Sequence, residues 1–340
     1  MFIFLIQISS RLTALRFVFP LEILFNRWQL LTNMKTPLLF SIMLLVSGMG
    51  YAQSTTKTFQ RDDKTYLYEE FNEVTEPRAL LVLFNGGSGI ASGIPRESSL
   101  ADSAVNYQIK TIGIDQSEFY LTDSTYHHIR EIILHVMNEN SIKNNLFIGG
   151  FSLGGFTSIR LSEKATEQKD SVMIPNAIFA IDPPLDHLEM RNYCLRELER
   201  VCSNVDANRL GKGEANWILD YYQQNFGPLE QDSSSYINHS CFTASSSNGG
   251  NARFLNSVPV KMIHEIDIMW LIEERCRDLS DANVLVSSKF INYLYDHGNK
   301  NAIISLTTNK GYRSDGRRHP HSWSIADPIE TLDWLMNYIQ

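Results

Sequence analysis

The chain has 340 residues, of which 43% are apolar and 20% are charged; these values are ordinary for a globular enzyme and allow one large α/β domain or two small ones. It holds 30 basic and 38 acidic residues, and because four of the basic and one of the acidic residues lie in the first 52 positions, the remainder holds 26 and 37, a net charge of −11. Nucleic acids and anionic membranes require clustered Lys and Arg, so this balance argues against both as partners.

The N-terminal part has the pattern of a secretory signal peptide over residues 34–52. Met34-Lys35 begins it, an apolar run over residues 38–46 follows, and small residues end it at Ala52. We therefore expect an exported protein, periplasmic or secreted, with no stable membrane span in the mature form. Residues 1–33 are then a non-native upstream extension; the alternative is an N-terminal membrane hairpin, because this stretch is also rich in Leu, Ile and Phe.

Buried strands and helices are predicted to alternate along residues 53–340. Alternating aromatic residues, Tyr66 and Tyr68, predict a strand at residues 61–74. Short apolar runs predict further strands at residues 79–84, 110–115, 146–149, 176–182, 258–266 and 302–307. Apolar residues at helical spacing predict a helix at residues 124–138, and a closing helix with several apolar residues is predicted at 328–339. Helix-compatible stretches are expected to form further helices at residues 97–107, 155–161, 273–279 and 282–295. This alternation indicates an α/β fold with a doubly wound, mostly parallel sheet. Residues 183–257 break the rhythm, and we expect them to form a helical cap inserted before the strand at 258–266.

The most informative motif is Gly150-Phe151-Ser152-Leu153-Gly154, which reads G-x-S-x-G. It lies between a predicted strand and a predicted helix, the context of a nucleophile elbow. A serine at such a turn adopts a strained backbone conformation, and glycines two positions before and after it relieve the clash. The helix that follows directs its N-terminus at the centre where negative charge develops.

The motif and the element order resemble the α/β-hydrolase superfamily, in a serine esterase or lipase-like form with a cap insertion. The resemblance covers roughly residues 66–338 and includes an acid and a histidine that follow the serine late in the chain, in the order Ser, Asp, His. It implies the α/β-hydrolase fold, a helical cap before the acid-bearing strand, and Ser152 as nucleophile.

A serine hydroxyl requires an adjacent base, which in this fold is a histidine after the last strand. The loop after residues 302–307 holds His319 and His321. We predict His321 as the base, because it precedes a Ser-Trp turn into the final helix, and His319 is the alternate. His264 lies on a strand and is expected to be a packed core residue.

The acid that orients the imidazole is expected after the strand that follows the cap. Asp267 falls at the end of that strand and is our prediction, with Glu265 as an alternate. Asp182, at the end of the preceding strand, is a third candidate, although Pro183-Pro184 would also suit an ordinary turn there.

Two backbone N–H groups are expected to bind the oxyanion of the tetrahedral intermediate. The resemblance assigns them to Leu153 and to Gly87 in the Asn85-Gly86-Gly87 loop, where many lipases have His-Gly-Gly. The same loop resembles a dinucleotide fingerprint only weakly, because Gly93 follows Gly89 by four residues rather than three.

The predicted function is that of an exported serine hydrolase, most simply a carboxylic-ester hydrolase with a Ser-His-Asp triad and a covalent acyl-enzyme. This chemistry requires no metal and no cofactor, and its partner is a small-molecule ester. The alternatives are a serine peptidase on the same fold and a non-catalytic, hydrolase-like binding protein. Export also implies oxidising conditions, in which four cysteines allow three pairings; Cys194–Cys202 is the most local.

Overall fold

A computed structural model of the protein describes residues 54–340, apart from residues 88 and 117. The predicted upstream extension at 1–33 and signal peptide at 34–52 lie outside the described residues. Among the described helices, none has the length and apolar character needed to cross a membrane.

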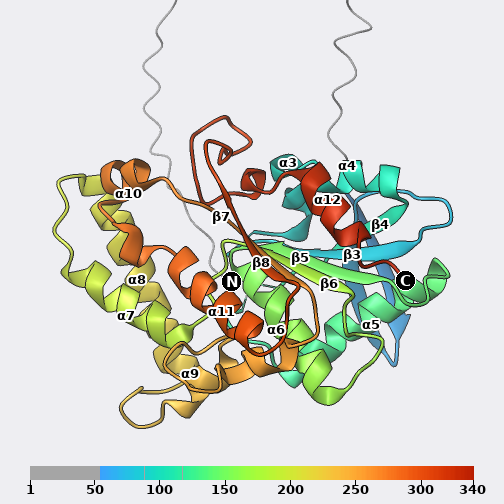
Figure 1. The fold of residues 1–340 in the computed structure, drawn as a ribbon, viewed down its shortest axis with the longest axis horizontal. Helices are drawn as coiled ribbons and strands as arrows, with labels where there is room; N and C mark the ends of the chain where they lie inside the picture. Colours follow the sequence, from blue (N-terminus) through green and yellow to red (C-terminus); the bar gives the residue numbers. More distant parts are fainter. Residues whose placement is uncertain (1–53, 88, 117) are drawn as a thin grey trace, which may run out of the picture. The chain divides into compact units, whose positions relative to one another are not determined.

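The described chain is built around an eight-stranded sheet in the order β1-β2-β4-β3-β5-β6-β7-β8 (Figure 1). Strands β3 to β8 pair in parallel, whereas β1 and β2 pair antiparallel to each other and β2 pairs antiparallel to β4. The strands are β1 (Thr55–Arg61), β2 (Lys64–Glu70), β3 (Ala79–Phe84), β4 (Ile109–Gly113), β5 (Leu146–Phe151), β6 (Ala177–Ile181), β7 (Val260–Glu265) and β8 (Ala302–Thr307). The predicted α/β class and mostly parallel sheet are confirmed.

The helices occupy both faces of the sheet (Figure 1). They are α3 (Ile94–Glu97), α4 (Leu100–Ala104), α5 (Asp123–Glu139), α6 (Leu153–Gln168), α7 (His187–Glu199), α8 (Val205–Asn225), α9 (Ser234–His239), α10 (Ile268–Arg275), α11 (Val284–Asp296) and α12 (Pro328–Met336). Successive residues of β3 point to opposite faces of the sheet, and both faces are buried. Leu80 packs with residues of α5, whereas Leu81 packs with residues of α4 and α12. Strands buried on both faces give the continuous apolar runs seen in the sequence.

The first predicted strand is instead a hairpin. Asp62 and Asp63, with φ of 48° and 60°, form the two-residue turn between β1 and β2. Two consecutive residues with positive φ match the right-handed twist of the flanking strands, and Asp tolerates this conformation better than most residues. A single strand over 61–74 was therefore wrong in its boundaries.

Helix α10 begins five residues before the helix predicted at 273–279. The carboxylate of Asp267 accepts a hydrogen bond from the N–H of Trp270 at 3.0 Å and so caps the helix. A capped N-terminus removes the cost of orphan N–H groups. The sequence pattern placed Asp267 at a strand end and missed this capping role.

The segment between β6 and β7 contains α7, α8, α9 and a 3₁₀ turn, Gly250–Leu255. Its side chains pack against α6 in one apolar cluster that includes Phe156, Tyr222, Phe226 and Tyr236. Most of its aromatic residues therefore belong to a core that the segment shares with α6 and the sheet. That the segment caps the site stays a prediction.

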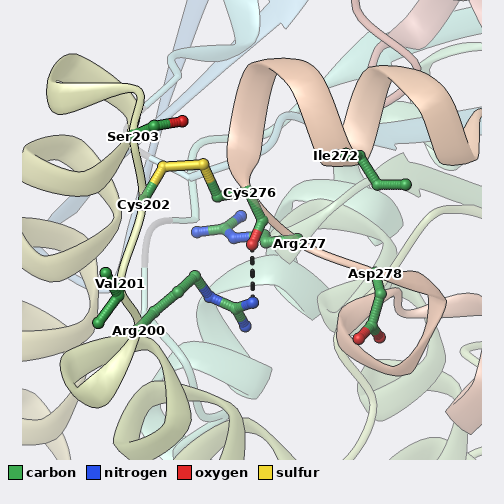
Figure 2. Close-up of a pocket in the computed structure, with 8 residues that line it drawn as sticks. All are labelled: Arg200, Val201, Cys202, Ser203, Ile272, Cys276, Arg277 and Asp278. Carbon is green, nitrogen blue, oxygen red and sulfur yellow. Dashed lines mark hydrogen bonds between the residues drawn. A yellow bond between two sulfur atoms is a disulfide. The ribbon is translucent and has the colours of Figure 1, made fainter.

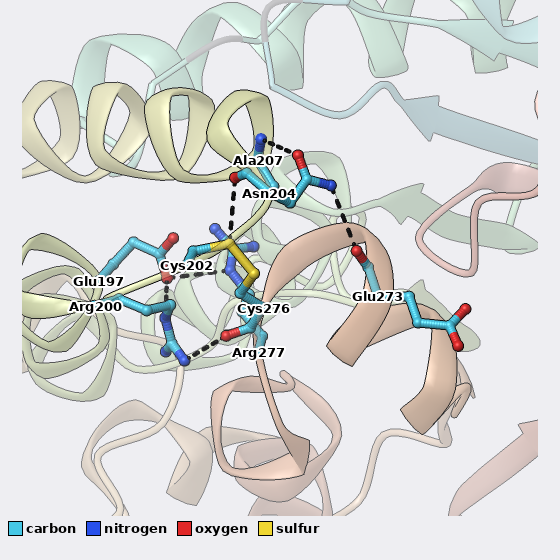
Figure 3. The surroundings of a disulfide bond; sticks show 8 residues. All are labelled: Glu197, Arg200, Cys202, Asn204, Ala207, Glu273, Cys276 and Arg277. Atoms are coloured by element: carbon cyan, nitrogen blue, oxygen red, sulfur yellow. Dashed lines mark hydrogen bonds and ion pairs between the residues drawn. A yellow bond between two sulfur atoms is a disulfide. The ribbon is translucent and has the colours of Figure 1, made fainter.

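A disulfide joins Cys202, just after α7, to Cys276, at the end of α10, and borders a surface pocket (Figure 2). Ion pairs surround it: Glu197 binds both Arg200 and Arg277 (Figure 3). The local pairing Cys194–Cys202 is wrong, because Cys194 faces the core from within α7 while Cys202 lies beyond the end of that helix. The disulfide instead links the inserted segment to the chain after β7.

Candidate active site

Ser152 occupies a sharp turn between β5 and α6, with φ of 54° and ψ of −118°. The surrounding glycines are required by close backbone approach. A Cβ on Gly150 would lie 2.4 Å from the backbone of Gly154, and a Cβ on Gly154 would lie 2.1 Å from the carbonyl oxygen of Phe84. The turn therefore has the strand, strained serine and helix expected of a nucleophile elbow.

The Ser152 hydroxyl meets the imidazole of His321, although 169 residues separate them. Ser152 Oγ lies 3.0 Å from His321 Nε2, and His321 Nδ1 lies 2.5 Å from Asp182 Oδ2. Because an ionised carboxylate only accepts hydrogen bonds, Nδ1 carries the proton and Nε2 presents its lone pair to the hydroxyl. This is the arrangement in which an imidazole can take a proton from a serine.

Asp182, rather than Asp267, contacts the imidazole, and the prediction of Asp267 is corrected. Asp182 directly follows β6, with φ of 47°, and its side chain is 17% exposed. Burial raises the pKa of this carboxyl, but His321 and His264 outweigh burial and hold the pKa well below its usual range. Asp182 is therefore ionised at neutral pH.

The two acids near the end of β7 have other contacts. Asp267 binds the guanidinium of Arg318 at 2.7 Å as well as capping α10. Glu265 also pairs with Arg318 and accepts from the N–H groups of Lys310 and Gly311 at 2.8 and 3.0 Å. Both carboxylates thus hold the loop after β8 in place.

A second imidazole binds Asp182. His264, expected to be a packed core residue, is 1% exposed, and its Nδ1 lies 2.8 Å from Asp182 Oδ1. The strand register explains the contact: Ile181 pairs with Ile263, so the next residues, Asp182 and His264, lie side by side at the ends of β6 and β7. Only a correct strand order would have revealed this neighbour from the sequence.

Two esterases of known structure share this fold across most of their length. An esterase from Pseudomonas putida is 12% identical with a TM-score of 0.52, covering 89% of this chain and 89% of its own. A carboxyl esterase from Tuber melanosporum is 14% identical with a TM-score of 0.51, covering 90% of this chain and 98% of its own. The protein has the α/β-hydrolase fold. An acylaminoacyl peptidase from Pyrococcus horikoshii also matches, at 13% identity and a TM-score of 0.49; the match covers 87% of this chain and 42% of the peptidase. No protein-family model and no curated protein matches the sequence.

His319, the alternate base, lies beside His321, and both of its ring nitrogens form hydrogen bonds. Its Nδ1 donates to the carbonyl oxygen of His321 at 2.7 Å, and its Nε2 accepts from Arg275 at 3.1 Å. Burial, together with the charges of Arg313 and Arg275, lowers the pKa of His319 to about 3. The neutral ring therefore supports the loop that presents His321.

The conformation of the loop after β3 is held by hydrogen bonds of the Asn85 side chain. Its Oδ1 accepts from the N–H of Gly86 at 2.9 Å and from the indole of Trp323 at 3.0 Å, while its Nδ2 donates to the carbonyl of Ile90 at 2.8 Å. Gly87 follows with φ of 51°, and Leu153 is the first residue of α6. Their N–H groups stay the proposed oxyanion donors.

The pocket of Figure 2 is a separate feature. Its lining comes from the residues just after α7, from α10 and from the residues just after α10, and none of Ser152, Asp182 and His321 belongs to it. In residues 54–340, leaving aside 88 and 117, no cluster of three or more His, Cys, Asp or Glu side chains has the geometry to hold a metal.

Proposed function

We propose that the protein is a serine hydrolase, most simply a carboxylic-ester hydrolase that uses Ser152, His321 and Asp182. The observation that carries the proposal is the continuous hydrogen-bonded path from Ser152 Oγ to His321 Nε2 and from His321 Nδ1 to Asp182. The α/β-hydrolase fold and the esterases that share it support the reaction class. The same fold occurs in proteins with other activities, so the proposed reaction is inferred from the geometry of the site rather than from the fold.

The proposed reaction begins when Ser152 Oγ attacks the ester carbonyl and its proton passes to His321 Nε2. The carboxylate of Asp182 stabilises the imidazolium that forms, and the N–H groups of Gly87 and Leu153 bind the oxyanion. Collapse breaks the bond to the leaving alkoxide, which receives the proton from His321. Water then attacks the acyl-enzyme with His321 as base, releasing the acid and restoring Ser152.

We also propose that the mature protein is exported, periplasmic or secreted, and acts on a small-molecule ester. The signal-peptide pattern at residues 34–52 supports export. The disulfide between Cys202 and Cys276 supports it independently, because such bonds persist in oxidising compartments.

A fluorophosphonate probe tests the nucleophile without knowledge of the substrate. The wild-type protein should be labelled at Ser152, as located by mass spectrometry of the digested adduct, and Ser152→Ala should remain unlabelled. Ser233→Ala, which changes a serine just before α9, is the matched control and should label like wild type. A folded wild-type protein that takes up no probe would favour the non-catalytic binding protein.

A further inference from the structure

Two arginines beside the proposed triad have no carboxylate partner, in contrast to their neighbours. Arg317 pairs with Asp315 at 2.6 Å, Arg318 with Asp267 at 2.7 Å, and Arg277 with Glu197 at 3.2 Å. Arg275, at the end of α10, and Arg313, in the loop after β8, form no ion pair with any residue that the structure describes. Both side chains are only partly exposed. A half-buried guanidinium without an anionic partner is costly, so the two require an explanation.

Arg313 lies against the aromatic residue that precedes the nucleophile. Its guanidinium carbon is 5.7 Å from the ring centre of Phe151, and that ring lies 4.5 Å from the ring of His321. Stacking on Phe151 holds the guanidinium but satisfies none of its N–H donors. The positive charge is therefore fixed next to the proposed catalytic imidazole.

The polar neighbour of Arg313 cannot serve as its acceptor. Arg313 Nη2 lies 3.5 Å from His319 Nδ1, but that nitrogen already donates its hydrogen to the carbonyl of His321. The N–H groups of Arg313 Nη2 and His319 Nδ1 therefore face each other, and neither can accept a hydrogen bond from the other. Nε2 of His319 accepts from Arg275, so the neutral ring ties Arg275 to the same corner of the site while leaving Arg313 unsatisfied.

The electrostatics agree with this geometry. Burial lowers the pKa of Arg313; Glu97 offsets part of that effect, and the charge of Arg275 lowers the pKa further. Burial and the charge of Arg277 lower the pKa of Arg275. Guanidinium groups remain protonated under these conditions, so the site holds two incompletely compensated positive charges.

We propose that Arg313 and Arg275 form an anion subsite, and that the preferred substrate is an ester carrying a carboxylate or phosphate group near the scissile bond. A carboxylate or phosphate of the substrate would accept hydrogen bonds from the N–H groups of Arg313 that have no acceptor in the structure. Planar guanidinium groups bind both anions in bidentate fashion. The inference rests on the proposed function and adds the class of its substrate.

Matched acetate esters test the subsite. The anionic probes are 4-acetoxybenzoate and 4-acetoxyphenyl phosphate, which separate a carboxylate source from a phosphate source, and the neutral probe is methyl 4-acetoxybenzoate. Wild-type protein should show a kcat/KM for at least one anionic ester about tenfold or more above that for the neutral ester. Raising the salt concentration should reduce this ratio.

The variants Arg313→Gln and Arg275→Gln should lower the anionic-to-neutral ratio about tenfold, with Arg313 dominant. Arg317→Gln is the matched control, since Arg317 lies in the same loop but pairs with Asp315, and it should keep the wild-type ratio. Equal losses on anionic and neutral esters in Arg313→Gln would overturn the proposal, because they would place Arg313 at the oxyanion or in loop support instead.

A binding measurement separates this inference from the proposed hydrolysis. Calorimetry on Ser152→Ala protein should show tighter binding of 4-acetoxybenzoate or 4-acetoxyphenyl phosphate than of the neutral ester, with the difference lost in Ser152→Ala/Arg313→Gln. That result with no turnover by wild-type protein would retain the anion site and reject the hydrolase. Turnover of neutral esters with no preference in rate or binding would reject the anion site alone.

Discussion

His264 Nδ1 lies 2.8 Å from Asp182 Oδ1, on the side of the carboxylate opposite to His321. Each carboxylate oxygen thus receives one imidazole N–H. His264 Nε2 is buried with no partner among the described residues, so the proton is best kept on Nδ1, where it is bonded. His264 therefore fixes the orientation of the acid without reaching the nucleophile.

Replacing His264 should lower kcat with little change in KM. His264→Ala removes one of the two donors that hold Asp182, and we expect kcat to fall by about tenfold, on the scale of one hydrogen bond to a charged group. His264→Asn places an amide donor near the position of Nδ1 and should recover much of the loss, whereas His264→Gln should not. Equal kcat values in the Asn and Gln variants, with equal melting temperatures, would assign His264 a packing role only.

The acid of the triad can be identified by a pair of Asp→Asn variants. Asp182→Asn should lower kcat/KM for p-nitrophenyl acetate by on the order of 10⁴, because the imidazole loses its tautomer control and its counter-charge. Asp267→Asn should retain activity within about threefold, since Asp267 caps α10 and binds Arg318. The reverse order of effects would restore Asp267 as the acid. Ser152→Ala and His321→Ala provide the reference for an inactive site, and each should lower kcat/KM by about 10⁴ or more.

Acid should destabilise the protein through His319. Its folded-state pKa of about 3 lies below the unfolded value of about 6.5. Between these values the unfolded chain binds more protons than the folded one, so the free energy of unfolding falls as pH drops from 6.5 toward 3. Urea denaturation at pH 7 and pH 4 should show a smaller drop for His319→Gln than for wild type. An identical drop in both proteins would show that His319 does not contribute.

The disulfide is testable by counting thiols. Unfolding without reductant should expose two reactive thiols, those of Cys194 and Cys241, and unfolding with reductant should expose four. The bond closes a loop over a sequence separation of 74, so Cys202→Ser/Cys276→Ser should lower the free energy of unfolding by about 2–4 kcal/mol. Four thiols in the non-reduced protein would contradict the pairing.

Two glycine substitutions should change stability in opposite directions. Gly154→Ala would place a Cβ 2.1 Å from the carbonyl oxygen of Phe84, and we expect a loss of about 3 kcal/mol or more. A Cβ on Gly213, on the exposed face of α8, would meet no atom within 4 Å, so Gly213→Ala should gain about 1 kcal/mol from helix propensity alone. Thermal unfolding of both variants measures the contrast, and a stable Gly154→Ala would refute the close approach at the elbow.

Much of the fold could be predicted because its signals are local. The apolar run at 79–84 coincides with β3, and the helix predicted at 124–138 coincides with α5 to within one residue at each end. The elbow at Ser152 could be located for the same reason. Its glycines are required because a Cβ there would clash with atoms a few residues away in the chain or with the end of the adjacent strand β3. The boundaries of α10 were missed because a cap is decided by one side chain whose direction the periodicity does not report.

The sequence by itself determined the parallel α/β sheet, the turn that strains Ser152 and the loop that supplies His321, since burial patterns and turn chemistry act over short stretches of chain. Only the tertiary structure decided that Asp182 meets His321, that His264 braces Asp182, and that Arg313 faces the site without an acceptor. These contacts join residues up to 139 positions apart. They depend on which strands are neighbours and in what register, and no local pattern in the chain encodes that information.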